Sequence, residues 1–163
     1  MVADFKLAER RAYETLDKLG LKKAPIDPEY VAESLGVPVR YAHFSEDVSR
    51  KISGYISFKP SAQIIINAKD APNRKTFTIA HELAHYLMHE TYAKSNGYQV
   101  MPRSYSHGNE KPDEEKEADA FAAHLLVPTH ELRKYKAWGV STPEMARIFA
   151  VSEDVIKNRM PWV

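Results

Sequence analysis

The stretch FTIAHELAHYLMH, residues 77–89, decides how this chain folds. Most of its residues suit a buried helix, yet it carries a glutamate between two histidines, in the order His81, Glu82 and His85. Because residues four apart lie nearly above one another on a helix, the two imidazoles point the same way. Apolar residues cover almost all of the remaining circumference, which predicts a helix buried on most sides.

A buried acid and two buried bases need a compensating charge, since an unpaired carboxylate inside a protein is very costly. A divalent cation would supply that charge. Imidazole suits zinc, and catalytic zinc sites use three protein ligands and one open position. Glu82 lies about 100° round the helix from His81, beside the metal, where it could take a proton from metal-bound water. The alternative, an accidental spacing on an exposed helix, does not fit the apolar surroundings.

A second helix is predicted over residues 113–127, DEEKEADAFAAHLLV, and Pro128 ends it. At about 100° per residue, Glu115 falls on the face of the alanines and leucines, whereas Glu117 points away, towards the face of His124. Small alanines would let this helix approach the first one closely. We therefore expect Glu115 to be the third metal ligand.

Asp119 lies one turn beyond Glu115 and can reach the same region. We expect its carboxylate to accept a hydrogen bond from the non-ligating nitrogen of a metal-bound histidine. The alternative is an acidic first turn that only complements the helix dipole. That alternative suits Asp113 and Glu114, but it does not explain acids on the apolar side of the helix.

Three short runs rich in β-branched residues predict strands: VPVRYAHF (37–44), SGYISF (53–58) and QIIIN (63–67). QIIIN is expected beside the helix of residues 77–89. If it lies at an exposed edge, it could pair with an extended substrate by strand addition. If it is a buried strand, it makes no substrate contact, and both alternatives stay open.

The remaining segments predict helices and one long loop. The amphipathic spacing of residues 4–19 predicts a helix, as do the segments after Asp27 and near 129–137. The polar residues 91–113 are typical of a long loop. The tail, residues 141–160, predicts two short helices joined by a turn. Helices with a few short strands make an α+β fold.

Composition excludes several classes of protein. Lys and Arg total 23 and Asp and Glu total 22, a net charge of +1, which is unlike a dedicated nucleic-acid binder. The chain has no cysteine, so disulfides, thiolate zinc sites and cysteine nucleophiles are excluded. No apolar run reaches membrane-spanning length, and the charged first residues do not resemble a signal peptide. We expect a cytoplasmic protein without membrane contact.

The motifs NRKTFTIAHELAHYLMH (73–89) and EKEADAFAAHLLVP (115–128) together resemble the ImmA/IrrE family of small bacterial and phage metallopeptidases. The similarity extends over residues 24–160, although Ala84 stands where glycine is frequent in the family. It implies a thermolysin-like gluzincin core, in which a small twisted three-stranded sheet packs on the buried HExxH helix. We expect this zincin-like domain to span residues 1–138, with a helix-turn-helix-like pair over 139–163.

The resemblance also implies the residues of the site and the substrate. His81, His85 and Glu115 would hold Zn²⁺, with Mn²⁺ as an alternative, and Glu82 would be the general base. Family members cleave helix-turn-helix transcriptional repressors and thereby release mobile-element, prophage or stress genes.

A peptidase also needs a donor to the developing oxyanion besides the metal. The candidates for this role or for substrate contact are Tyr86, Tyr105 and His107, and the sequence does not choose among them. Tyr86 could simply be a partly buried helix residue, and His107 a solvated loop residue. The other histidines have no partner at ligand spacing and are interpreted as structural or surface residues: His43, His89, His124 and His130.

A second function from another class remains open. The chain could be a non-catalytic, metal-containing regulatory module that contacts a repressor, an antitoxin or DNA. Glu82 favours the enzyme, because structural metal sites fill all four positions with protein groups and need no extra glutamate. Residues 141–163 carry three basic and three acidic side chains, so direct DNA binding is disfavoured. We expect an endopeptidase with low activity on generic peptides.

Overall fold

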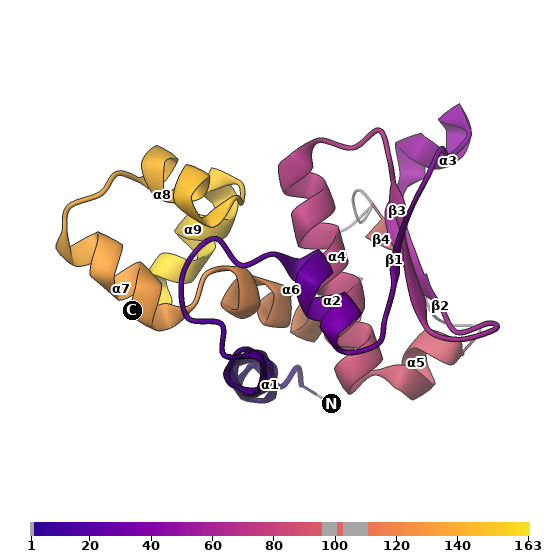
Figure 1. The fold of residues 1–163 in the computed structure, drawn as a ribbon, viewed down its shortest axis with the longest axis horizontal. Helices are drawn as coiled ribbons and strands as arrows, with labels where there is room; N and C mark the ends of the chain where they lie inside the picture. The colour runs from indigo at the N-terminus through magenta and orange to yellow at the C-terminus, as the bar shows by residue number, and fades with distance from the viewer. Residues whose placement is uncertain (1, 96–100, 103–110) are drawn as a thin grey trace.

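The computed structural model describes residues 2–95, 101–102 and 111–163. Its elements follow in the order α1 (Phe5–Leu19), α2 (Pro28–Ser34), β1 (Val39–Ala42), α3 (Glu46–Lys51), β2 (Ile52–Ser57), β3 (Gln63–Asn67), α4 (Pro72–Met88), α5 (Glu90–Lys94), β4 (Met101–Pro102), α6 (Asp113–Leu126), α7 (Thr129–Ala137), α8 (Thr142–Phe149), α9 (Glu153–Arg159) and the 3₁₀ turn η1 (Met160–Trp162). Helices predominate around one small mixed sheet, so the predicted α+β class is confirmed (Figure 1).

The sheet has the strand order β1-β3-β2-β4. All three predicted strands are present, and the two-residue β4 adds to the edge of β2. Strand β3 runs parallel to β1 and antiparallel to β2, so QIIIN is paired on both sides. Of the two open alternatives for QIIIN, the exposed edge is therefore wrong, because the crossover from β1 places β3 in the middle of the sheet.

Helix α4 packs against the sheet through β2 and β3, and α6 packs against α4 (Figure 1). The approach of β2 to α4 depends on Gly54. A Cβ atom at this position would lie 2.6 Å from the carbonyl oxygen of Ile65 and 2.9 Å from Cγ2 of Thr78. Thr78 is fully buried on α4. The missing side chain thus lets the sheet close over the middle of α4.

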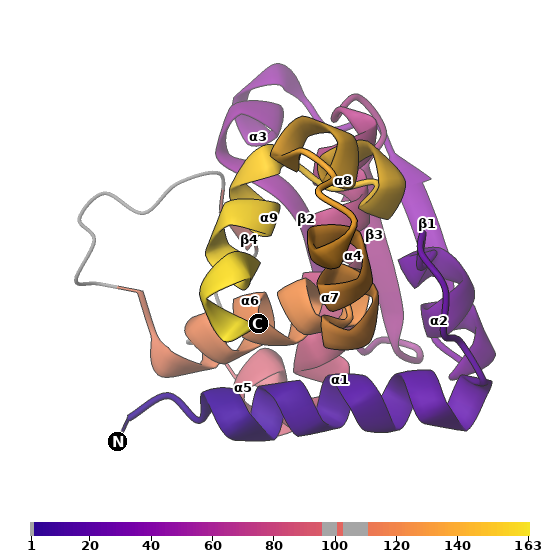
Figure 2. The same ribbon diagram turned by 90° about the vertical axis from the view of Figure 1, so that its left-hand side faces the viewer.

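Helix α1 runs along α6, as Figure 2 shows at the lower side of the molecule. Its fully buried Ala8 and Ala12 share the core with Ala118 and Ala122 of α6. Small residues on facing helices allow close packing. Asp4 caps the start of α1 by accepting a hydrogen bond from the amide of Leu7.

The predicted loop 91–113 is wrong at residues 91–94, which belong to α5, and at residues 101–102, which form β4. A Lys94–Glu90 ion pair of 2.5 Å supports this short helix. Because such i,i+4 pairs stabilise a helix only slightly, the pair is a weak sequence signal for α5.

In the ranges that the structure describes, no helix combines the length and the apolar character needed to cross a membrane.

The two predicted C-terminal helices are present as α8 and α9, each capped by a serine side chain. Between them Ala150 takes a left-handed conformation with φ 57°. The buried Arg159 at the end of α9 donates to the carbonyl oxygen of Val127 and to Oγ1 of Thr129. These bonds join α9 to the junction of α6 and α7. The assignment of residues 139–163 to a separate unit stays a prediction.

Candidate metal centre

Three side chains from two helices converge between α4 and α6. His81 and His85 come from α4 and Glu115 from α6, and one ligand atom of each lies within 4.8 Å of the others. All three are buried. The Glu115 carboxylate faces both imidazoles, with Oε1 3.1 Å from Nε2 of His81 and Oε2 2.7 Å from Nε2 of His85.

The second nitrogen of His81 is held by Asp119. Nδ1 of His81 lies 2.8 Å from Oδ1 of Asp119, and Lys111 forms an ion pair with the same carboxylate. A carboxylate accepts, so Nδ1–H donates to Asp119. Nε2 of a neutral His81 then carries its lone pair on the side of Glu115.

The second nitrogen of His85 has a partner that sequence reasoning missed. Nδ1 of His85 lies 3.1 Å from Nδ1 of His89, whose Nε2 lies 2.7 Å from Oε2 of Glu117. Both His89 and Glu117 are buried. The interpretations of His89 as partnerless and of Glu117 as pointing away are wrong.

The error has a physical origin. Glu117 lies off the face of Glu115 on α6, but Asp4 just before α1 and His89 just before α5 contact it on that other face. One signal could have found the pair. His89 continues the i,i+4 series of His81 and His85, and it ends α4 at the junction with α5.

Glu82 is fully buried on α4, and its charge raises the pKa of the neighbouring His81. Tyr86 is partly buried and packs against the hydrophobic core. Tyr105 and His107 lie outside the described residues. The candidates for an oxyanion donor therefore stay predictions.

The ionisable side chains of the cluster shift one another's pKa values. Burial lowers the pKa of His81, but the hydrogen bonds with Asp119 and Glu115 outweigh it and raise the pKa to about 10. Burial would raise the pKa of Glu115, yet its two histidine partners hold it well below its usual range. For His85 and His89 burial dominates and lowers the pKa of each. These shifts favour a protonated, positively charged His81 beside an ionised Glu115.

This donor set fits a divalent metal ion. Two imidazole nitrogens and one carboxylate match the three protein ligands of catalytic zinc sites. Each histidine has an outer partner for its other nitrogen, as ligand histidines usually do. Once His81 has given up its second proton, two Nε2 lone pairs and a carboxylate face one another, and a cation between them would remove their mutual repulsion.

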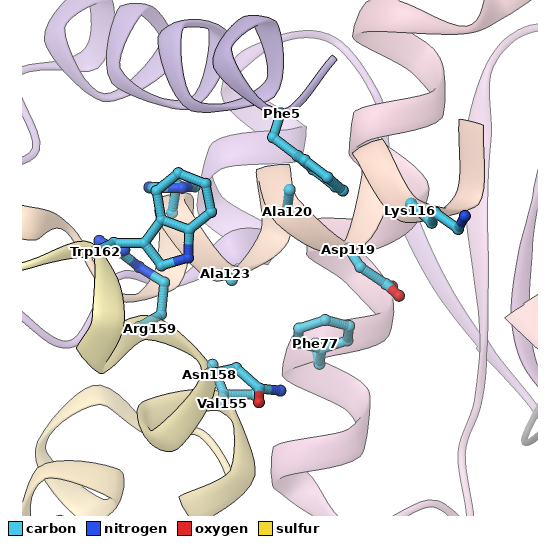
Figure 3. Close-up of a pocket in the computed structure, with 11 residues that line it drawn as sticks. Phe5, Phe77, Lys116, Asp119, Ala120, Ala123, Val155, Asn158, Arg159 and Trp162 are labelled. Carbon is cyan, nitrogen blue, oxygen red and sulfur yellow. The ribbon is translucent and has the colours of Figure 1, made fainter. Parts of the chain in front are cut away.

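Asp119 also lines a pocket of about 340 Å³ beside the cluster (Figure 3). Its apolar wall includes Phe5 of α1, Phe77 of α4 and Trp162 of η1, while Lys116 lies on the same side as Asp119. The sequence did not predict this pocket, because its walls come from segments that are far apart in the chain.

Two of the other histidines have structural or surface positions. His124 is buried edge-on between Tyr13 and Trp162. His130 is exposed and bonds to the backbone oxygen of Lys22. Both agree with the sequence interpretation.

Comparisons with known proteins bear on these features. The sequence model of the Peptidase_M78 family, described as the IrrE N-terminal-like domain, matches residues 32–160. No curated protein matches the chain. A solved structure of a Mycobacterium tuberculosis transcriptional regulator is similar in fold, with a TM-score of 0.64 and 17% sequence identity. The similarity covers 93% of this chain and 45% of the regulator, so the chain spans less than half of that protein's length.

Proposed function

Because this chain belongs to the Peptidase_M78 family of IrrE N-terminal-like domains, we propose that it is a metal-dependent endopeptidase. The observation that carries the proposal is the convergence of His81, His85 and Glu115, with Glu82 buried next to His81 on the same helix. A non-catalytic metal module would not need Glu82 at that place.

In this proposal His81, His85 and Glu115 would hold zinc, or alternatively manganese. The bound ion would supply Lewis-acid chemistry, polarising the scissile carbonyl and making a water molecule acidic near neutral pH. Glu82 takes the proton of the attacking water as a C–O bond forms. It then delivers this proton to the leaving nitrogen as the peptide C–N bond breaks.

Asp119 would hold His81 in the orientation that this chemistry needs. Its hydrogen bond to Nδ1 leaves Nε2 directed at the Glu115 side. The ion pair with Lys111 keeps Asp119 itself in place and ionised, because burial alone would raise the pKa of this carboxyl, whereas His81 and Lys111 lower it. The metal ligands are thus supported from outside the cluster.

The substrate in this proposal is a protein, most simply a helix-turn-helix repressor whose cleavage derepresses mobile-element, prophage or stress genes. The support comes from family resemblance. The name of the Mycobacterium tuberculosis relative points to transcriptional regulation for that protein only. The balanced charge of residues 141–163 supports protein contact over direct DNA contact, and the absence of cysteine suits a cytoplasmic place of action.

A Glu82→Gln variant tests the enzymatic proposal. The amide preserves shape but cannot accept the water proton, so we expect peptide hydrolysis to fall by about 10²–10⁴-fold while zinc remains bound. The measurement is mass-spectrometric detection of new termini in a broad peptide library and in purified helix-turn-helix repressors, with the zinc-loaded protein.

Metal content measured in parallel supplies the controls. A Glu115→Gln variant should lose stoichiometric zinc, whereas Glu114→Gln, on the same helix but outside the cluster, should keep it. Equal cleavage by the wild type and by Glu82→Gln would rule out the general-base role. A wild type that takes up no zinc would rule out the metallopeptidase itself.

A further inference from the structure

The outer hydrogen bonds of His85 form a continuous chain. Nδ1 of His85 contacts Nδ1 of His89 at 3.1 Å, and Nε2 of His89 contacts Oε2 of Glu117 at 2.7 Å. Oε1 of Glu117 accepts a hydrogen bond of 2.8 Å from the backbone N–H of Asp4. This series of hydrogen bonds therefore leads from a proposed metal ligand, His85, to Asp4 at the start of α1.

The direction of each bond follows from the chemistry of its ends. Glu117, as a carboxylate, can only accept, so Nε2–H of His89 must donate to it. A neutral imidazole has one protonated nitrogen, which leaves Nδ1 of His89 as an acceptor. Nδ1–H of His85 must then donate, and the lone pair of His85 remains on Nε2, the atom that faces Glu115.

Glu117 is well suited to set this direction because both of its oxygens are engaged. One accepts from His89 and the other from an amide that cannot accept in return. The carboxylate is buried, with a relative exposure of 8% for the residue, so water competes little for these bonds. The orientation of Glu117 is thus fixed from two sides.

We propose that Glu117 and His89 are positioning residues that hold His85 in the tautomer with Nε2 turned to the metal. This inference rests on the proposed metal centre. Asp119 acts on His81 through one direct bond, whereas His85 is reached through an intervening imidazole. The two ligand histidines are thus supported by different carboxylates of the same helix, α6.

A Glu117→Gln substitution replaces one accepting oxygen of this series of hydrogen bonds with a donating nitrogen. The amide has one accepting oxygen and one donating nitrogen, but its two partners, Asp4 N–H and His89 Nε2–H, are both donors. If the amide nitrogen faces His89, the imidazole must reverse its tautomer, and His85 then loses its lone pair on Nε2. If the amide nitrogen faces Asp4 instead, the hydrogen bond from the backbone N–H of Asp4 to residue 117 is lost.

The first experiment measures zinc affinity by chelator competition and the visible absorption spectrum of the cobalt-substituted protein. Loss of an outer partner typically weakens metal binding by about 10–100-fold, which we expect for Glu117→Gln and for His89→Leu. The matched control is Glu114→Gln, which removes the same charge near His89 without removing a bond to it. The zinc affinity of this control should stay within about threefold of the wild type. Only Glu117→Gln and His89→Leu should change the absorption spectrum of the cobalt-substituted protein.

A second measurement does not depend on any variant. Nitrogen-15 chemical shifts of the imidazoles in the zinc-loaded wild type should show His89 protonated at Nε2 and unprotonated at Nδ1. Protonation at Nδ1 of His89 would overturn the inference, and so would zinc affinities of Glu117→Gln and Glu114→Gln that equal each other.

The two proposals fail in different ways. If the wild type binds no zinc and no cobalt, the metal centre itself is refuted. If the wild type binds zinc tightly and Glu117→Gln binds it equally well, only the positioning role is refuted. Thermal unfolding of each metal-free variant separates a general loss of stability from a loss of metal affinity, because positioning leaves the metal-free melting temperature close to that of the wild type.

Discussion

At the scale of single residues, His124 carries a titratable ring inside an aromatic corner. Its ring lies edge-on to Tyr13 and Trp162, with centroid distances of 5.8 and 5.4 Å. The Tyr13 hydroxyl lies 3.4 Å from Nδ1. Burial, with a contribution from the positive charge of Arg159, lowers the pKa of His124 from 6.5 to about 4.

This shift predicts a pH-dependent loss of stability. Between pH 6.5 and 4 the unfolded chain binds a proton at His124 that the folded protein does not bind. The free energy of unfolding is therefore lowered as the pH falls through this window, by about 2 kcal/mol at pH 5 from this group. Urea unfolding of the metal-free protein at pH 7 and pH 5 measures it.

A His124→Gln variant is the control, because glutamine does not titrate. Its free energy of unfolding should fall less between pH 7 and pH 5 than that of the wild type. All other titrating groups are shared, so the difference between the two slopes isolates His124. Equal slopes would show that the buried ring is not responsible.

At the scale of elements, the packing of β2 on α4 decides whether the HExxH helix is covered. A Gly54→Ala substitution would force its Cβ within 2.6 Å of the Ile65 carbonyl oxygen and 2.9 Å of Thr78. Since one neighbour is backbone and cannot rotate away, we expect a loss of about 1–3 kcal/mol in the free energy of unfolding. Urea unfolding measures this loss.

Arg40→Ala provides the comparison for Gly54→Ala. Arg40 is exposed on β1, so its removal should change the free energy of unfolding by less than about 0.5 kcal/mol. Stability of Gly54→Ala equal to that of the wild type would mean that β2 and α4 can separate at no cost, contrary to the close packing in this structure.

At the scale of the whole molecule, Arg159 joins the C-terminal helix α9 to the junction of α6 and α7. Its guanidinium donates to the carbonyl oxygen of Val127, 32 residues earlier in the sequence, and to Thr129, 30 residues earlier. Arg159→Met keeps much of the volume but leaves that buried carbonyl without these donors, which costs about 1–3 kcal/mol. We expect a lower melting temperature and a single cooperative transition.

Lys157→Ala, on the exposed side of α9, should leave the melting temperature nearly unchanged. Calorimetry of both variants checks the result. If Arg159→Met produced two separate transitions, residues 139–163 would melt independently of the body of the protein, as the predicted boundary at 138 and 139 allows.

Taken by itself, the sequence determined the features that depend on local periodicity. The four-residue spacing of His81 and His85 and the angular position of Glu115 on α6 follow from helix geometry alone. The three strands followed from β-branched runs between turn residues. These are properties of one segment at a time, so no knowledge of its neighbours was needed.

Only the tertiary structure decided which segments cover one another. Glu117 meets His89 and the amide of Asp4, the latter 113 residues away in sequence, because the fold brings the end of α4 and the start of α1 to the same side of α6. The central place of β3 and the need for glycine at position 54 likewise arise from neighbours across the fold. Periodicity tells which side of a helix a residue occupies, but the partner on that side is chosen by the packing of the whole chain.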